Sequence, residues 1–310
     1  MSMNTLLEKI TTYQNPTVAG LDPKLDYIPE YIKEAAFSRS DDPLDAAAQA
    51  LLDFNKGLID ALCDIVPAVK PQAAYYEMYG WQGMRALTET IAYAHEKGMY
   101  VIIDGKRNDI GSTMEAYAAA HLGTTMVNGR EAAAFGGDCL TVNGYLGSDG
   151  ITPLLKLCRE RDKSIFVLVK TSNPSSGELQ DRKLGEKTVY EAMAEMCEAW
   201  GEQALGRYGY TSVGAVVGAT YPEQLKELRT KAPHTFFLVP GYGAQGGGAK
   251  DVAHAFDKNG LGAIINSSRG IMCAYKKESC DEKDYAQAAR REALRMKADI
   301  MSEIKEIRLP

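Results

Sequence analysis

The segment VIIDGKRNDIGST, residues 101–113, begins as a run of apolar, mostly β-branched residues and ends abruptly in charge. Within six positions it carries Asp104, Lys106, Arg107 and Asp109. Burying carboxylates and an ammonium group is costly unless they pair with one another. The segment therefore predicts a buried strand that leads directly into a cluster of functional charges.

Similar apolar runs recur along the chain, and stretches rich in Ala, Glu, Leu and Lys separate them. Alternating strands and helices indicate a parallel sheet, and nearly continuous apolar strands indicate that both of its faces are covered. Eight such units predict a closed (β/α)₈ TIM barrel. An open doubly wound sheet is the alternative, although no GxGxxG follows the first strand. The predicted strands are TVAGL (17–21), IVPAVK (65–70), MYVIID (99–104), CLTVN (139–143), SIFVLVK (164–170), SVGAVVG (212–218), TFFLVP (235–240) and GAIINSS (262–268).

The whole chain, residues 1–310, is expected to form one domain, because α/β barrels reach this length without dividing. Two connections are unusually long: residues 22–43 follow the first strand, and residues 171–188, rich in Ser, Gly and charge, follow the fifth. Long loops at a barrel mouth are typical of lids and substrate loops, and 171–188 is our candidate lid. Helices are predicted over residues 45–64, 80–98 and 190–209.

Composition limits the classes of partner. The chain is 45% hydrophobic and 25% charged, and its net charge of −6 argues against a nucleic-acid or anionic-membrane surface. The six cysteines form no CxxC pair, so neither zinc nor a redox dithiol is indicated, and scattered thiols suit a reducing compartment. There is no signal-peptide core and no apolar run long enough to span a bilayer. We therefore expect a cytoplasmic protein that binds neither nucleic acid nor membrane.

Ionisable residues gather where the first three predicted strands end, which is the end at which barrel enzymes hold their active sites. Asp22 follows the first strand, and Lys70 ends the second. Asp104 ends the third, with Lys106 two residues beyond. Four charges converging from adjacent strands are costly unless they are mutually paired, so these residues are the candidate site.

Asp104 and Lys106 are two residues apart and so point to the same face of an extended chain. With Lys70 on the neighbouring strand, the charges can alternate as Lys–Asp–Lys. An ion-pair network that only closes the barrel is the alternative. Lys170 and Asn143 end the fifth and fourth strands. Their polar character is sufficiently explained if these strands simply end at a polar surface.

A glycine-rich segment, PGYGAQGGG at residues 240–248, follows the seventh strand. Its glycines allow close backbone approach, and the next stretch, AKDVAHAF, is predicted to be a helix whose N-terminal amides are free to bind an anion. Arg269, after the eighth strand, can add a bidentate contact. Barrels commonly hold phosphate at these two loops. A tight turn without a ligand is the alternative.

Five motifs together resemble those of the orotidine 5′-phosphate decarboxylase family, in particular its longer bacterial form. They are GLDP, VKPQ, DGKRNDIGST, PGYGAQGG and NSSRG, and the resemblance extends from Asp22 to Arg269. It implies a homodimeric TIM barrel that converts orotidine 5′-monophosphate to UMP and CO₂, the last step of UMP biosynthesis. It implies neither a cofactor nor a metal.

The resemblance also assigns roles to residues. Lys70, Asp104 and Lys106 match the catalytic charged array, and Asp109 matches a fourth member that acts in trans, in the site of the partner subunit. Ser268 stands where shorter members often have Gly. The expected substrate-binding residues are Asp22 for the ribose, Ser172 for the pyrimidine, Gln245 and Arg269 for the phosphate, Ile110 and Thr113 at the subunit interface, Asn143 at the end of its strand, and Gly246 in the glycine-rich segment.

These residues suit a decarboxylation in which no cofactor, such as pyridoxal phosphate or thiamine, accepts the electron pair. Loss of CO₂ from C6 leaves a poorly delocalised electron pair, which Lys106 can stabilise and then protonate. Asp104 would lie beside the substrate carboxylate, and their repulsion ends as CO₂ leaves. A Schiff-base lysine is disfavoured because flanking aspartates hold the amine charged, and none of the four histidines reads as a base or ligand. Two alternatives stay open: a Mg²⁺-dependent sugar-phosphate lyase on the same scaffold, and a barrel that binds nucleotides without catalysis.

Overall fold

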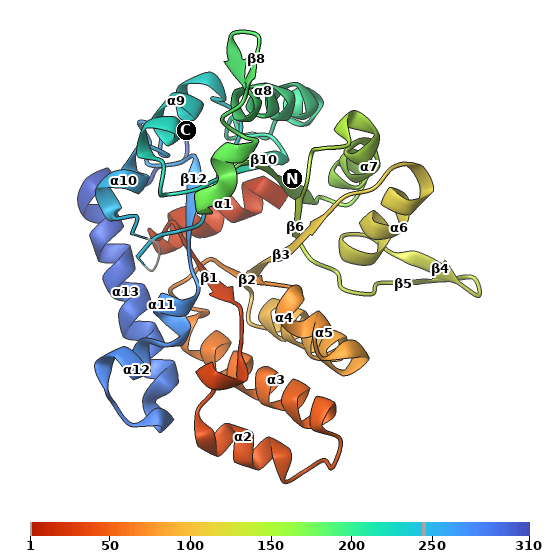
Figure 1. Ribbon diagram of the computed structural model, residues 1–310, viewed down its shortest axis with the longest axis vertical. Coiled ribbons are helices and arrows are strands. Elements are labelled where there is room, and N and C mark those ends of the chain that lie inside the picture. The colour runs from red at the N-terminus through yellow and green to blue at the C-terminus, as the bar shows by residue number, and fades with distance from the viewer. Residues whose placement is uncertain (1, 244–245) are drawn as a thin grey trace.

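Eight parallel strands close into a barrel surrounded by helices in the computed structural model, which describes residues 2–243 and 246–310 (Figure 1). The TIM barrel predicted from the sequence is confirmed, and the doubly wound sheet is wrong. Each predicted apolar run overlaps one barrel strand. In order around the ring the strands are β1 (Thr17–Leu21), β12 (Ala263–Ser267), β11 (Phe237–Val239), β10 (Val213–Val217), β7 (Ser164–Lys170), β6 (Cys139–Val142), β3 (Tyr100–Arg107) and β2 (Ala68–Pro71).

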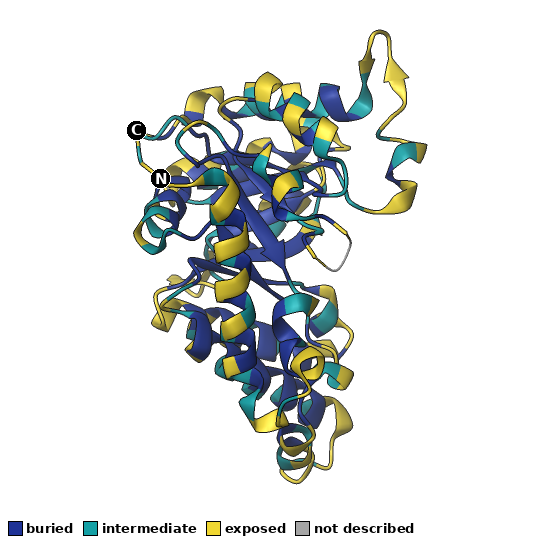
Figure 2. Ribbon diagram, turned by 90° about the vertical axis from the view of Figure 1, so that its left-hand side faces the viewer, coloured by how far each residue is buried: buried dark blue, intermediate teal, exposed yellow. Residues whose placement is uncertain are grey.

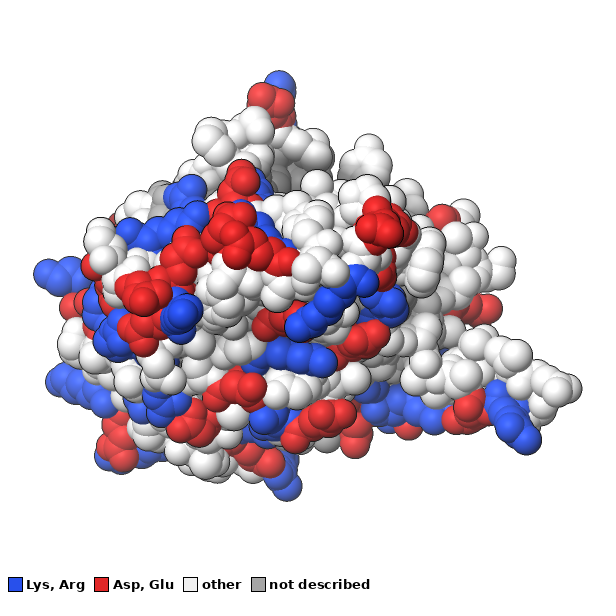
Figure 3. Space-filling view, turned by 90° about the horizontal axis from the view of Figure 1, so that it is seen from below, with Lys and Arg blue, Asp and Glu red and all other residues white. Residues whose placement is uncertain are grey.

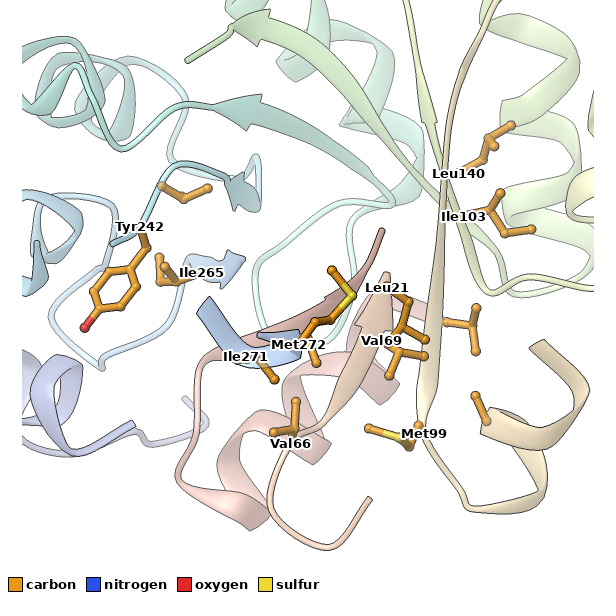
Figure 4. Close-up of a cluster of buried hydrophobic side chains, with 14 of the residues drawn as sticks. Leu21, Val66, Val69, Met99, Ile103, Leu140, Tyr242, Ile265, Ile271 and Met272 are labelled. Carbon is orange, nitrogen blue, oxygen red and sulfur yellow. The ribbon is translucent and has the colours of Figure 1, made fainter. Parts of the chain in front are cut away.

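Successive residues of each strand alternate between two packing environments, as the pleat requires. Val18, Ala68 and Ile102 belong to a cluster that fills the inside of the barrel. Val69 and Ile103 belong to the larger cluster between the strands and the surrounding helices (Figure 4). Followed toward the carboxyl ends of the strands, the inner positions change from apolar to charged, and this change creates the site described below.

Helix α1 (Ser2–Tyr13) closes the end of the barrel at which the strands begin. Its side chains Met3, Leu6, Leu7 and Ile10 are at most 1% exposed and pack in the same cluster as the inner strand residues. Burial of four such side chains contributes roughly 1.5–3 kcal/mol each before entropy is counted. The floor of the barrel is therefore solid protein, and only the opposite end is open.

Two of the surrounding helices, α3 and α8, begin at a residue whose side chain caps the helix. Asp42 accepts a hydrogen bond from the amide of Leu44 at 2.9 Å, and Pro43 occupies the first helical position of α3. The helix predicted over 190–209 is shorter than expected: α8 ends at Gly201, whose close packing on Thr211 leaves no room for a Cβ. The helices that follow α1 are α2 (Glu30–Phe37), α3 (Pro43–Leu62), α4 (Ala74–Glu77), α5 (Gly80–Glu96), α6 (Gly111–His121), α7 (Thr152–Glu160), α8 (Val189–Gly201), α9 (Pro222–Lys231), α10 (Ala249–Ala253), α11 (Arg269–Met272), α12 (Ala274–Glu278) and α13 (Tyr285–Ile304).

The two long connections carry structure of their own. Residues 22–43 contain a 3₁₀ turn, Leu25–Tyr27, and helix α2, which packs on α3. Residues 171–188 contain a 3₁₀ turn, Pro174–Glu178, and a short hairpin of β8 (Lys183–Leu184) and β9 (Lys187–Thr188). This hairpin projects from the body, and its exposed residues contrast with the buried barrel strands (Figure 2). A second projecting hairpin pairs β4 (Thr125–Val127) with β5 (Arg130–Ala132).

Charge is mixed on the face of the molecule that is seen from below. On the face seen from below, Lys and Arg side chains alternate with Asp and Glu side chains, so neither sign dominates (Figure 3). None of the helices formed by the described residues combines the length and apolar character needed to cross a membrane.

Candidate active site

Asp104 is the centre of the charged cluster. Its Oδ2 accepts a hydrogen bond from Lys70 Nζ at 2.6 Å, and its Oδ1 accepts from Lys106 Nζ at 2.7 Å and from the Thr141 hydroxyl at 2.8 Å. The Lys–Asp–Lys alternation expected from the sequence is therefore present. Both carboxylate oxygens are engaged, so Asp104 is held in one orientation by three neighbours from three strands.

Electrostatics keep this cluster charged. Burial acts to raise the pKa of Asp104, but the ammonium groups of Lys70 and Lys106 outweigh burial and hold that pKa far below its usual range. Burial acts to lower the pKa of Lys70, whereas Asp104 and then Asp22 raise it, and the balance lies above the usual value. At neutral pH Asp104 is an anion and Lys70 a cation, although the side chains are only 10% and 5% exposed.

Strand register brings these groups together. Gly20 pairs with Lys70 across β1 and β2, and Gln72 forms a bridge to Asp104. The pairing of β3 with β6 then shifts register between Ile103 and Arg107, which marks a bulge. Within this bulge Lys106 has φ = 49°, a left-handed conformation that is uncommon for a residue other than glycine. Its amide donates to the Thr141 hydroxyl at 3.0 Å, so the backbone of Lys106 is fixed as well as its ammonium group.

Two cavities meet at the charged cluster, and Lys70, Asp104 and Pro240 line both. The first has a volume of 490 Å³ and the second 390 Å³. Besides the shared residues, the first is lined by Asp22, Lys24, Tyr27, Tyr75, Gly241, Tyr242, Asn266, Ser267, Ser268, Arg269 and Met272, and the second by Lys106, Thr141, Leu168, Thr171, Ser172, Asn173, Gln180, Val216 and Leu238.

The first cavity contains polar groups with unused bonding capacity. Asp22 Oδ1 and Asn266 Oδ1 are buried and have no hydrogen-bond partner in the described part of the chain. The guanidinium of Arg269 likewise makes no hydrogen bond or ion pair with any described residue. Since buried polar atoms are normally satisfied, the two buried oxygens indicate a ligand with hydroxyl groups. Arg269 is exposed at the same cavity, and its guanidinium is available to bind an anion.

The second cavity combines apolar walls with a polar edge. Leu168, Val216 and Leu238 come from inner positions of β7, β10 and β11, and Pro240 follows β11. The polar side chains come from the 171–188 loop at the end of β7: Thr171, Ser172, Asn173 and Gln180. A cavity of this kind suits a flat ring with hydrogen-bonding groups on its rim.

Several predicted residues lie outside these cavities. Asp109 is half-buried and accepts from the amide of Ile110, which is 53% exposed, and Thr113 is exposed on α6. The side chain of Asn143 accepts from the amide of Tyr145, two residues later. Gly246 has φ = 99° in the glycine-rich loop, and Gln245 lies outside the described residues. The structure thus brings together Asp22, Lys70, Asp104, Lys106, Ser172 and Arg269 around the cavities. The roles of these residues and of the others stay predictions.

Two expectations need correction. Lys170 does not end its strand at a polar surface: it is 0% exposed, and its ammonium pairs with Asp181 of the following loop at 2.6 Å. The helix after the glycine-rich segment, α10, has only five residues, and Asp251 already accepts the amide of Gly248 at 2.8 Å. The amide of Gly248, which was expected to be free to bind an anion, therefore already donates to a carboxylate of the same chain.

Sequence reasoning missed Thr141, Asn266 and Gln180. Thr141 lies two residues after Cys139, which faces the barrel interior, and Asn266 lies two residues after Ile264, which does the same. Because side chains alternate between the two faces of a strand, both residues could have been predicted to face the barrel interior. Gln180 lies inside a loop, where no periodicity applies, so no pattern in the sequence indicated it.

The donor set does not favour a metal at this site. Among the described residues no group of three or more His, Cys, Asp or Glu side chains is placed to hold a metal ion. A metal at Asp104 would have to displace Lys70, Lys106 or the Thr141 hydroxyl from its oxygens.

Comparison with known proteins identifies the family of this chain. Residues 45–282 match the model of the orotidine 5′-phosphate decarboxylase / HUMPS family. The chain is 47% identical to the orotidine 5′-phosphate decarboxylase of Rhodopirellula baltica, over 90% of this chain and 92% of that protein, and 42% identical to that of Clostridium perfringens over 98% and 99%. The structure of Leishmania donovani OMP decarboxylase matches with a TM-score of 0.70 and 31% identity, over 96% of this chain and 99% of that one. The chain therefore belongs to the orotidine 5′-phosphate decarboxylase family.

Proposed function

We propose that this protein decarboxylates orotidine 5′-monophosphate to UMP and CO₂. The observation that carries the proposal is the Lys70–Asp104–Lys106 array at the place where the two cavities meet. The second cavity suits a pyrimidine ring, and the first, with its unused polar groups and Arg269, suits a ribose phosphate. The curated relatives carry the name of this activity over almost the full length of the chain.

In the proposed reaction the bond from C6 to the carboxylate carbon breaks, and its electron pair stays on C6. Lys106 stabilises this pair as a fixed cation and then transfers one proton to C6, which leaves neutral amine on the enzyme and UMP as product. Solvent returns the proton to Lys106 after release. Asp104 lies next to the departing carboxylate and is itself held by Lys70 and Thr141, so it does not move away as the substrate binds.

Groups remote from C6 supply binding energy. Asp22 is proposed to accept from a ribose hydroxyl, since its Oδ1 has no other partner in the described chain. Arg269, together with Gln245 and Gly246 of the glycine-rich loop, is proposed to hold the phosphate. Ser172 is proposed to contact the pyrimidine from the edge of the second cavity. Such contacts can be used at the reacting centre when a loop closes.

We also propose a homodimer in which Asp109 completes the site of the partner subunit. Asp109 lines neither cavity of its own barrel, although it lies three residues after Lys106. Ile110 next to it exposes half of an apolar side chain. Placing this rim at a twofold interface would cover Ile110 and Thr113 and turn Asp109 toward the neighbouring site.

The reaction is tested by the fall in orotidine-monophosphate absorbance with purified protein in EDTA, with UMP identified as the product. Turnover is expected without added metal, because lysines and a threonine already occupy the Asp104 carboxylate. A requirement for Mg²⁺ would instead support the sugar-phosphate-lyase alternative. Tight binding of UMP without turnover would support a nucleotide-binding barrel.

The dimer is tested by mixing two inactive variants, Lys106→Ala and Asp109→Ala. A hybrid dimer has one site with both changes and one with neither. With random exchange half of the dimers are hybrid, so about a quarter of all sites should regain activity. Differently tagged subunits report exchange independently. Exchange without recovery would show that Asp109 serves its own barrel.

A cytoplasmic location is proposed from the thiols. The six cysteines are all free, and three of them, Cys139, Cys158 and Cys197, are buried, with pKa values raised by burial. Unpaired cysteines fit a reducing compartment.

A further inference from the structure

The 171–188 loop is tied to the end of β7 by two neighbouring residues. Asp181 Oδ1 pairs with Lys170 Nζ at 2.6 Å. Gln180 Oε1 accepts from the amide of Thr171 at 2.9 Å, and Gln180 Nε2 donates to the Thr171 hydroxyl at 2.7 Å. We call Lys170, Thr171, Gln180 and Asp181 the clasp. It folds the loop back so that Gln180 lines the second cavity.

The buried ammonium of Lys170 favours the closed clasp. Within the described chain, Asp181 is the only carboxylate at salt-bridge distance from Lys170. The Ser176 hydroxyl, also in the loop, accepts from Lys170 at 3.2 Å, and the ring of Tyr221 lies 4.2 Å from its nitrogen. Because a buried ammonium without a counter-charge is costly, Lys170 keeps the residue next to Gln180 in place.

The amide of Gln180 has a defined orientation. A backbone amide can only donate, so the atom facing Thr171 N must be the oxygen, and the other end must be the NH₂ group. The Thr171 hydroxyl accepts one hydrogen of that group and donates its own to Asn173 Oδ1 at 2.6 Å. One N–H of Gln180 is left, and it belongs to a side chain on the cavity. The edge of the second cavity thus offers a donor.

We propose that Gln180 determines base specificity by donating a hydrogen bond to the C4 carbonyl of the bound pyrimidine, and that Lys170 and Asp181 are positioning residues for it. A uracil ring presents an acceptor at C4, whereas a cytosine ring presents an amino group, so two donors would meet. This inference rests on the proposed function and adds a residue that selects the base.

Binding of UMP and CMP tests the donor. Gln180→Glu keeps an acceptor for the Thr171 amide but removes the donor, so the preference for UMP over CMP should fall about tenfold or more, the effect of one hydrogen bond. Gln180→Ala should lower the preference similarly and serves if the glutamate variant does not fold. Glu178→Gln is the matched control, since this exposed residue of the same loop does not line the cavity, and its preference should equal that of the unchanged protein.

Steady-state kinetics test the positioning residues. Asp181→Asn removes the counter-charge of Lys170, and the KM for orotidine monophosphate should rise about tenfold because the loop no longer holds Gln180 on the cavity. Asp181→Glu restores the charge and should bring KM back toward the original value. A residue needed only for folding would lower the amount of active enzyme without changing its KM.

The outcomes separate this inference from the proposed function. If the protein turns over orotidine monophosphate but the UMP preference survives in both Gln180 variants, the specificity role is overturned alone. An unchanged KM in Asp181→Asn overturns the positioning role. Absence of turnover in the unchanged protein overturns the proposed function and this inference with it.

Discussion

Lys70 and Lys170 each lie at the carboxyl end of a barrel strand, and each is almost fully buried and forms an ion pair with one carboxylate, yet they face different surroundings. Lys70 keeps the alternation of β2 and points inward, where its partner Asp104 lies on the neighbouring strand. Beside Lys170, the pairing of β7 with β10 shifts register, so that Lys170 pairs with Val217, a residue of the outer cluster. The bulge turns Lys170 out of the barrel and under the 171–188 loop.

The partners differ as much as the lysines. The carboxylate side chain of Asp104 is 10% exposed and is held by three donors from rigid strands, whereas that of Asp181 is 47% exposed and belongs to a loop. A pair between strands can only break if the barrel deforms. A pair between a strand and a loop can open locally and admit water. The Lys70–Asp104 pair is suited to a permanent electrostatic environment. The Lys170–Asp181 pair is suited to a loop that opens and closes in each catalytic cycle.

The largest effect is expected at the third lysine of this comparison. Lys106 shares Asp104 with Lys70, but its side chain is 46% exposed and lines the second cavity. Lys106→Ala should lower kcat at least about 10⁴-fold, more than ~5 kcal/mol, with UMP binding largely kept, because the role proposed for Lys106 is confined to the transition state. Lys9→Ala, at the closed end of the barrel, is the control. A variant that keeps more than about a tenth of kcat would exclude Lys106 as the proton donor.

The stability of the two ion pairs is compared directly by removing each carboxylate. Asp104→Ala leaves Lys70 buried without its main partner and should lower the free energy of unfolding by roughly 3–5 kcal/mol. Asp181→Ala should cost only about 1 kcal/mol, because the loop can open and hydrate Lys170. Urea unfolding of both variants gives the two values. Equal losses would mean that the clasp is as rigid as the strand pair.

A smaller effect is expected at Arg269, which in contrast to all three lysines has no partner within the described chain. Arg269→Ala should weaken UMP binding by roughly 1.5–3 kcal/mol, the contribution of a charge-assisted contact, and should barely change the binding of uridine. Titration calorimetry with both ligands measures the difference. Equal losses for the two ligands would place Arg269 away from the phosphate.

The same contrast explains what could be predicted from the sequence. The barrel and the positions of Asp22, Lys70 and Asp104 follow from strand alternation, because these residues continue the inner face of regular strands. Lys170 was misjudged because a register shift breaks that alternation. Gln180 could not be found because its position depends on loop contacts between side chains. The role proposed for Asp109 requires a second subunit, which the sequence of one chain indicates only through the family resemblance.

The packed end of the barrel formed by α1 also limits the source of the hydrogen that is transferred to C6 of the product. Since the lower end of the barrel is filled by side chains such as Met3 and Leu6, the ammonium of Lys106 can exchange with water only through the mouth. If a nucleotide and the proposed lid cover that mouth, the three hydrogens of the Lys106 ammonium cannot exchange with solvent before one of them is transferred to C6. With Lys106 as donor, the isotope at C6 of each UMP molecule records the water that the lysine met before the substrate entered.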